Sequence, residues 1–312
     1  GSVIDVFCGT VESGSGVLVA FSTSPTQVLI AAVLIALLIR FLVSRTDWRA
    51  TPIDPVVRRR RAGQLIRAAA REYRRTPLVF LLIGTIYLPA LVVTGALSAL
   101  IQLIPFVSSL LSLAGRSSGT SVILAIFVGS LSNVAAFVAI NGIVAEYLSR
   151  PSRGLTTAVE ALRAAWDRRR ALLAAFVRSF GIVFVLLVSF VGIPWGIRQL
   201  VRYQFIAHTV MYEDRNGRDA LARSSQLVHG RWFHTAVVVG ALNAAVGIIA
   251  LVVALLLLLI VVSGLPLWLF SILVSIVYTC TVPLAAVAMA LLYGDAAAER
   301  DEAEQAEAVA VG

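Results

Sequence analysis

The chain has 312 residues, of which 59% are hydrophobic and 14% are charged, and its mean hydropathy is +0.91. Soluble domains are roughly 45–50% apolar and about 25% charged, so this composition excludes a water-soluble enzyme. All 26 basic residues are arginines, and against 17 acidic residues they give a net charge of +9. Arginine collects in the cytoplasmic segments of membrane proteins, so its distribution predicts the topology.

The first part of the chain predicts one membrane span followed by a basic helix. Residues 1–24 are expected to be an extracytoplasmic N-terminus, and residues 25–45 a transmembrane helix. In residues 46–77, arginines alternate with apolar residues at helical spacing, which is typical of a helix lying in the membrane interface. The arginines expected to contact anionic lipid there are Arg58, Arg59, Arg60, Arg61, Arg67 and Arg71.

Residues 78–148 predict a transmembrane hairpin. The uncharged run over residues 76–115 would be about 60 Å long as one helix, twice the hydrocarbon thickness, and therefore has to break. A second basic interfacial helix is expected over residues 149–171. Its lipid-contacting arginines are expected to be Arg168, Arg169 and Arg170.

Residues 172–213 predict a second hairpin whose return arm is ambiguous. Residues 195–212 are mostly apolar, yet they contain Arg198, Arg202 and His208. If all basic segments are cytoplasmic, an even number of spans separates each from the next, so this stretch must return across the membrane. Its 18 residues are just long enough. The alternative is a six-span protein in which residues 195–212 lie in the interface.

A third basic helix, a third hairpin and an acidic tail complete the chain. They occupy residues 214–235, 236–293 and 294–312, and the tail is expected to be flexible and cytoplasmic. Each basic segment has an aromatic residue before its hairpin, at Tyr73, Trp166 and Trp232, which indicates a repeated unit. The sequence therefore predicts an all-α polytopic membrane protein with about seven spans, one N-terminal and six in three hairpins.

A family resemblance rests on residues 202–232. They read Arg202-Tyr203-Gln204-Phe205-Ile206-Ala207-His208, then Met211-Tyr212-Glu213-Asp214, Gly217, Asp219-Ala220-Leu221-Ala222-Arg223-Ser224 and Arg231-Trp232. This pattern resembles prokaryotic membrane proteins similar to the membrane domain of glycerophosphoryl diester phosphodiesterases and to YciC-type inner-membrane proteins. The resemblance implies a helical domain of the prokaryotic plasma membrane, without the catalytic barrel that accompanies it in the phosphodiesterases.

One candidate site lies in the ambiguous arm. Arg198 and Arg202 are one helical turn apart and share a face, and His208 follows two turns later. Together they predict a site for a lipid phosphate or another anion. The alternative is that both arginines extend to the lipid headgroups or pair with a carboxylate in the bundle.

A second candidate is an electrostatic latch made by Glu213, Asp214, Arg218 and Asp219. Acidic residues beside arginines at a helix end are expected to hold the third amphipathic helix against its neighbour. His229 and His234 are five residues apart and miss the spacing of a helical metal pair, so no metal or cofactor is expected. No catalytic residue is expected either.

The function that fits these patterns is a non-enzymatic membrane protein that binds or organises anionic lipid. It could equally support a membrane complex with a protein partner or a second copy. The arginine cluster at residues 58–61 adjoins a span, which favours anionic lipid over nucleic acid. The alternative is a transporter, channel or scramblase-like protein for lipid or a small anion, suggested by the repeated hairpins.

Overall fold

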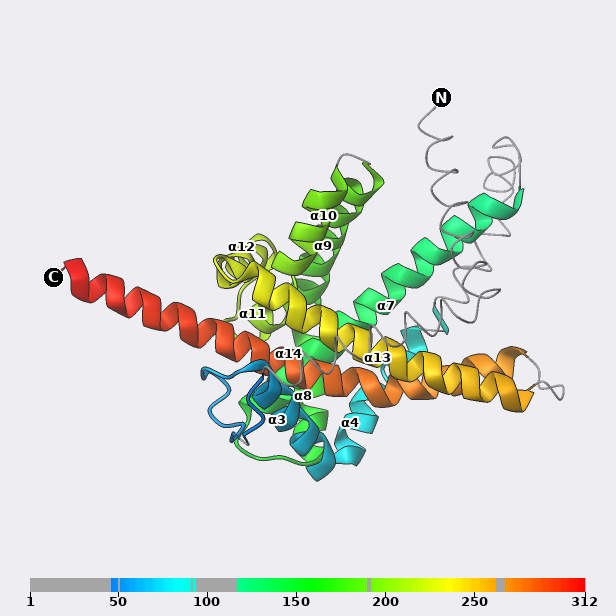
Figure 1. Ribbon diagram of the computed structural model, residues 1–312, viewed down its shortest axis with the longest axis horizontal. Coiled ribbons are helices and arrows are strands. Elements are labelled where there is room, and N and C mark those ends of the chain that lie inside the picture. The colour runs from blue at the N-terminus through cyan, green and yellow to red at the C-terminus, as the bar shows by residue number, and fades with distance from the viewer. Residues whose placement is uncertain are drawn as a thin grey trace. The chain divides into compact units, whose positions relative to one another are not determined.

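The computed structural model describes residues 46–49, 51–90, 92–93, 117–189, 192–261 and 267–311. Within these ranges the chain is helical and contains no β-strand (Figure 1). It divides into two compact units, Gly1–Arg49 and Ala50–Gly312, and the second is described below. The predicted N-terminus and first span over residues 1–45, and the tip of the first hairpin over residues 94–116, lie outside the described residues.

The helices of the described ranges follow the order of the predicted elements. They are α3 (Ala62–Arg75), α4 (Pro77–Gly84), α7 (Ser117–Ser149), α8 (Leu155–Asp167), α9 (Arg169–Val188), α10 (Ile193–Arg202), α11 (Ile206–Tyr212), α12 (Gly217–Val228), α13 (Trp232–Val261) and α14 (Leu267–Val311). Among the described residues, four segments are long and apolar enough to cross a membrane, namely Leu131–Ser149, Arg169–Leu187, Trp232–Ile249 and Ser275–Val309. The predicted class, an α-helical chain with helices able to span a membrane, is confirmed.

Two helical hairpins are visible in Figure 1, where α9 runs beside α10 and α13 beside α14. Helix α4 packs against both α14 and α7. Gly84 makes the contact with α14 close, because a Cβ atom added there would lie 2.0 Å from the carbonyl oxygen of Thr279. Small residues allow helix backbones in membrane proteins to approach in this way.

The charged helix ends gather in one body, which we call the base. It consists of α3, α8, α11 and α12 together with the adjoining ends of α7, α9, α13 and α14, which pack on one another. Large side chains are fully buried in the base, among them Leu65, Tyr147, Phe205, Leu227 and Leu292. Helices α3, α8 and α12, which belong to the three segments predicted to be basic helices, therefore contribute to one core.

The return arm of the second hairpin differs from the predicted span over residues 195–212. It consists of two helices, α10 and α11, separated at residues 203–205. The hydroxyl of Ser224 in α12 causes the separation, because it donates to the Arg202 carbonyl at 2.6 Å and accepts from the Phe205 N–H at 3.2 Å. The return arm is therefore not one continuous helix, and α10, with 10 residues, is about 15 Å long.

The acidic segment over residues 294–312 also differs from the prediction of a flexible tail. Helix α14 continues through this segment to Val311. Asp295, near the start of the segment, is buried. The segment is rich in alanine and glutamate, which favour helix, and ion pairs hold its first turns in the base. Residues 301–309 are exposed.

Candidate functional site

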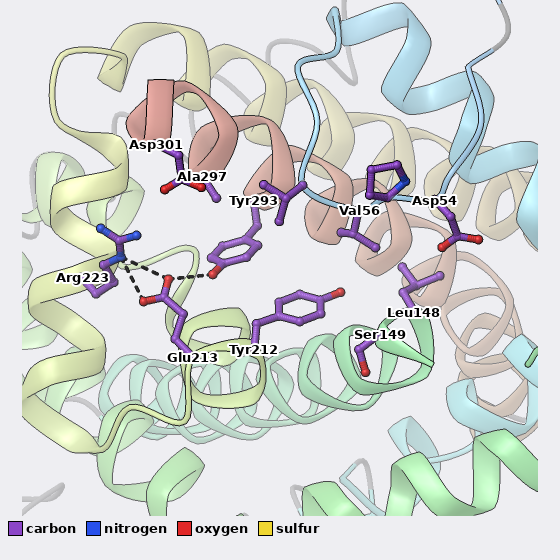
Figure 2. Close-up of a pocket in the computed structure, with 12 residues that line it drawn as sticks. Asp54, Val56, Leu148, Ser149, Tyr212, Glu213, Arg223, Tyr293, Ala297 and Asp301 are labelled. Atoms are coloured by element: carbon purple, nitrogen blue, oxygen red, sulfur yellow. Dashed lines mark hydrogen bonds and ion pairs between the residues drawn. The ribbon is translucent and has the colours of Figure 1, made fainter. Parts of the chain in front are cut away.

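A pocket of about 510 Å³ lies in the base (Figure 2). Its walls come from residues 54–57 ahead of α3, the end of α7, the end of α11, Arg223 of α12 and one face of α14. The α14 face presents Tyr293, Ala297 and Asp301, which are spaced four residues apart and therefore line one side of a helix. The pocket thus brings together segments that are far apart in the sequence.

One wall belongs to a non-helical segment over residues 51–61, which we call the strap. The strap folds around its own Arg60, which is only 5% exposed. The Arg60 guanidinium donates to four carbonyl oxygens at 2.7 to 3.1 Å, those of Pro52, Ile53, Pro55 and Val56. The backbone N–H of Arg60 donates to Asp295 of α14 at 2.9 Å. The prediction that Arg60 contacts lipid is wrong, because the guanidinium is buried and its two terminal nitrogens donate inside the protein.

Glu213 stands at the inner end of the pocket and accepts hydrogen bonds from three side chains. Arg223 Nε lies 3.0 and 3.1 Å from its two oxygens, and the Tyr293 hydroxyl donates at 2.7 Å (Figure 2). Arg215 Nε donates at 2.9 Å. Burial alone would raise the pKa of Glu213, but the hydrogen bonds outweigh it and hold that pKa below its ordinary value. Glu213 is therefore ionised at neutral pH.

The predicted latch is present with different partners. Glu213 binds Arg223 and Arg215 rather than Arg218, and it joins the end of α11 to α12. Asp214 lies 3.4 Å from Arg168, which belongs to the junction of α8 and α9. Arg218 and Asp219, the other two predicted members, are exposed on α12 and form no ion pair within the described ranges.

An aromatic stack lies behind Glu213. The Tyr293 ring is nearly parallel to the rings of Tyr212, at 5.3 Å, and His208, at 5.5 Å. His208 is completely buried, and neither ring nitrogen has a hydrogen-bond partner in the described part of the chain. Burial lowers the pKa of His208 to about 3, so this histidine of α11, which is outside the four candidate spans, stays neutral.

The predicted anion site is not assembled. His208 is neutral inside the base, whereas Arg198 is exposed on α10 and Arg202 is half-buried at its end. The break at residues 203–205 explains the difference, because His208 no longer continues the helix face that carries the arginines. The prediction that the three residues bind one anion together is wrong.

Tyr212 forms the floor of the pocket. Figure 2 shows its ring extending along the cavity, with the hydroxyl toward Val56 and Leu148 and away from Glu213. The hydroxyl oxygen is buried and has no hydrogen-bond partner among the described residues. Burial raises the pKa of Tyr212, so its hydroxyl keeps its proton. A buried polar group without a partner is unfavourable and calls for an explanation.

The remaining predicted lipid contacts fall into two groups. Arg168 donates to the carbonyl oxygens of Val210 at 3.3 Å and Met211 at 2.8 Å, so it caps the end of α11 and the prediction of a lipid contact is wrong. Arg59 is exposed but pairs with Glu302 at 3.2 Å. The others are exposed or, for Arg71, half-buried, namely Arg58, Arg61, Arg67, Arg71, Arg169 and Arg170.

Sequence reasoning missed the pocket, because its residues Tyr212, Arg223, Tyr293 and Asp301 come from three different helices. One available signal was the four-residue spacing of Tyr293, Ala297 and Asp301, which indicates one face of a helix. The prediction of a flexible tail over residues 294–312 left this spacing unused. In the described part of the chain, no three His, Cys, Asp or Glu side chains are grouped to hold a metal ion. Comparison of the chain with protein-family models, curated proteins and solved structures finds no match.

Proposed function

We propose that the chain is a non-catalytic integral membrane protein that binds or organises anionic lipid through α8 and α3. The observation that carries this proposal is the reversed polarity of α8. Its exposed face carries large apolar side chains, namely Leu155 (53% exposed), Val159 (39%), Leu162 (43%) and Trp166 (65%). Its buried face consists of the small residues Thr157, Ala158, Ala161 and Ala165. A water-facing helix has the opposite arrangement, so lipid is the favoured neighbour of this face.

Arginines beside this apolar stripe suit it to anionic headgroups. Arg163, Arg169 and Arg170 are exposed on α8 and at the start of α9, and the Arg169 guanidinium lies 5.0 Å from the Trp166 ring centroid. Tryptophan and arginine together are typical of the interface between hydrocarbon and headgroups. Each arginine near an anionic surface contributes about 1 kcal/mol of binding free energy.

Helix α3 adds a second basic surface. Arg67, Arg71 and Arg74 recur at intervals of four and three residues, so they share the helix face opposite Leu65 and Ala69, which are buried. Anionic headgroups complement such a row of guanidinium groups.

Helix α12 is not assigned to lipid. It buries its large apolar residues Leu221, Leu227 and Val228 against the protein and exposes Arg218 and Gln226. We therefore propose that the segment over residues 214–235, which was predicted to lie in the membrane interface, faces water instead.

The topology that we propose places the base on the cytoplasmic side of a prokaryotic plasma membrane, with α9 and α10 as a hairpin that returns to the base. Packing of α3, α8 and α12 into one body supports a common side for the three segments that precede the hairpins. The resemblance of residues 202–232 to the phosphodiesterase membrane domains agrees with this topology.

Spin labels test the position of α8. In a chain with Cys8 and Cys280 replaced by serine, labels are introduced by Leu162→Cys on α8 and Ala222→Cys on α12, and the protein is reconstituted in vesicles containing phosphatidylglycerol. We expect the label at position 162 to be more accessible to oxygen than to a water-soluble nickel chelate, and the label at position 222 to show the reverse. Equal preference for the nickel chelate at both positions would contradict lipid contact by α8.

Bound lipid is the second readout. We expect Arg169→Gln with Arg170→Gln to reduce the phosphatidylglycerol retained in native mass spectrometry, whereas Arg218→Gln on α12 leaves it unchanged. Lipid scrambling or anion flux above that of empty vesicles would instead favour the transporter or scramblase alternative.

A further inference from the structure

We propose that the pocket in the base binds an aliphatic diamine or polyamine, a ligand with protonated amines at both ends of an apolar chain. The proposal is independent of lipid binding, because the pocket and the apolar face of α8 have no residue in common. It rests on the charge of the lining, on the arrangement of its ends and middle, and on one unpartnered hydroxyl.

The lining is acidic although the whole chain is basic. Three carboxylates, those of Asp54, Glu213 and Asp301, face one guanidinium, that of Arg223. Arg223 is already held by both oxygens of Glu213. Asp54 is paired with Arg153, and Glu213 is paired with Arg223 and Arg215. Asp301 is therefore the lining carboxylate without an ion pair in the described ranges, and a cation is its complementary ligand.

The two carboxylates that remain for a ligand lie at opposite ends of the site. Figure 2 shows Asp54 on the strap at one end and Asp301 on α14 at the other, with Val56 and Tyr293 between them. Asp54 uses Oδ1 to accept from Arg153 at 3.0 Å, and its side chain is 72% exposed, which leaves Oδ2 for a ligand. Asp301 is exposed and has no ion pair within the described ranges. Each end can therefore receive one ammonium group.

The middle of the pocket is apolar and aromatic. Tyr212 and Tyr293 supply stacked rings, and Val56, Leu148 and Ala297 supply aliphatic surface. Methylene groups gain free energy when they leave water for such a wall. An ammonium group beside a tyrosine ring is also attracted by the electrons of its face.

The buried hydroxyl of Tyr212 gives an independent reason for a ligand. It points along the pocket, and no protein group in the described part of the chain bonds to it. The oxygen is covered by the wall, so the wall must shift before an ammonium or a secondary amine of a polyamine can donate a hydrogen bond to it. A bound amine would thereby remove an unfavourable unpaired polar group.

A metal ion fits this pocket less well than an amine. The described residues hold no cluster of three metal-ligating side chains. Glu213, the innermost carboxylate, already accepts from Arg223, Arg215 and Tyr293, which occupy the positions that a metal would need.

Titration calorimetry of the full chain in phosphatidylcholine nanodiscs tests the proposal without anionic lipid. The probes are putrescine and spermidine, with butylamine as the single-amine control and 1,4-butanediol as the uncharged control. We expect saturable binding of the two polyamines, about tenfold weaker binding of butylamine, and no binding of the diol. Failure of both polyamines to saturate, or equal affinity for butylamine and putrescine, would overturn the proposal.

Variants connect binding to the pocket. We expect Asp301→Asn and Tyr212→Phe each to weaken spermidine about tenfold, whereas Glu307→Gln, which removes an exposed carboxylate elsewhere on α14, leaves the affinity unchanged. Unfolding temperatures of the variants are measured alongside, and Asp301 is exposed, so its amide variant is expected to fold as the parent does. Equal weakening by Asp301→Asn and Glu307→Gln would show nonspecific attraction to the acidic helix and would overturn the assignment.

Discussion

The carbonyl oxygen of Val56 lies directly against the backbone of Gly294, where an added Cβ atom would be only 2.0 Å away. The strap and α14 are therefore in contact without any side chain between them. Because backbone atoms of both segments meet at this point, a change of side-chain rotamer cannot make room for an added methyl group. We expect Gly294→Ala to displace the strap and to reduce the free energy of unfolding by about 1–3 kcal/mol, the range for overpacked sites.

The measurement is thermal unfolding in detergent together with limited proteolysis of the strap. Gly240→Ala on α13 is the matched control, because no atom lies within 4 Å of a Cβ added there. We expect the control to unfold at the parent temperature or above it, since alanine is the better helix former. Equal behaviour of the two variants would mean that the strap does not rest on Gly294.

Arg60 provides the second prediction, because one buried guanidinium satisfies four carbonyl oxygens of the strap. Lysine keeps the charge but has three donors on one nitrogen and cannot reach all four acceptors. We expect Arg60→Lys to destabilise the protein by about 2–3 kcal/mol, the value of one or two hydrogen bonds to a charged group.

The neighbouring Arg58 is exposed, so Arg58→Lys is expected to leave the stability unchanged. Urea unfolding followed by tryptophan fluorescence compares the two variants. If both variants unfold at the same urea concentration as the parent, the strap is held by other contacts.

The third prediction concerns the ion pair between Arg231 and Asp295, whose side chains are only 8% and 6% exposed. This pair joins the start of α13 to α14. Asp295→Asn leaves the buried Arg231 with Glu299 as its remaining partner, so we expect the variant to destabilise the protein by about 1.5–3 kcal/mol, the range for a hydrogen bond to a charged group. Glu304→Gln breaks the exposed pair with Arg300 and is expected to change stability by less than about 1 kcal/mol.

A double-mutant cycle checks this interpretation. With Arg231→Met and Asp295→Leu combined, both charges are removed, and we expect the double variant to be more stable than Asp295→Leu alone. A double variant that loses the sum of the two single effects would indicate that the two residues act independently.

Hydrophobic periodicity and the positions of the charges predicted an α-helical chain with segments able to span a membrane, as the described residues show. Helix α8 begins inside the segment predicted over residues 149–171, and α13 begins inside the one predicted over residues 214–235. These features are local, because the spacing of apolar residues and the composition of each run determine them. The same spacing does not say which helix face packs against protein, so α8 and α12 look alike in sequence although α8 exposes its large apolar residues and α12 buries them.

The features that could not be predicted depend on side chains far away in the chain. The break between α10 and α11 is made by the hydroxyl of Ser224, and the burial of Asp295 depends on Arg231 and the strap. The pocket also depends on contacts between distant segments, because the strap, α11, α12 and α14 must all be in place before Tyr212 and Asp301 line the same cavity. Sequence patterns report contacts within one helix and not these long-range ones.

The last prediction is a pH dependence caused by His208, whose pKa burial lowers from 6.5 to about 3. Between these two values the unfolded chain binds one proton more than the folded chain, so the free energy of unfolding falls as the pH falls. The slope is about 1.4 kcal/mol per pH unit, which gives a loss of about 2 kcal/mol between pH 6.5 and 5. His208→Phe keeps a flat ring against Tyr293 but has no titrating group, so we expect it to remove the part of the slope that His208 contributes. Urea unfolding at pH 7, 6 and 5 measures the effect and avoids the more acidic range in which Glu213 also takes up a proton.

His229→Gln is the control, because His229 is exposed and its replacement is expected to leave the slope of the parent protein intact. Parallel pH profiles for the parent and His208→Phe would show that another group carries the dependence.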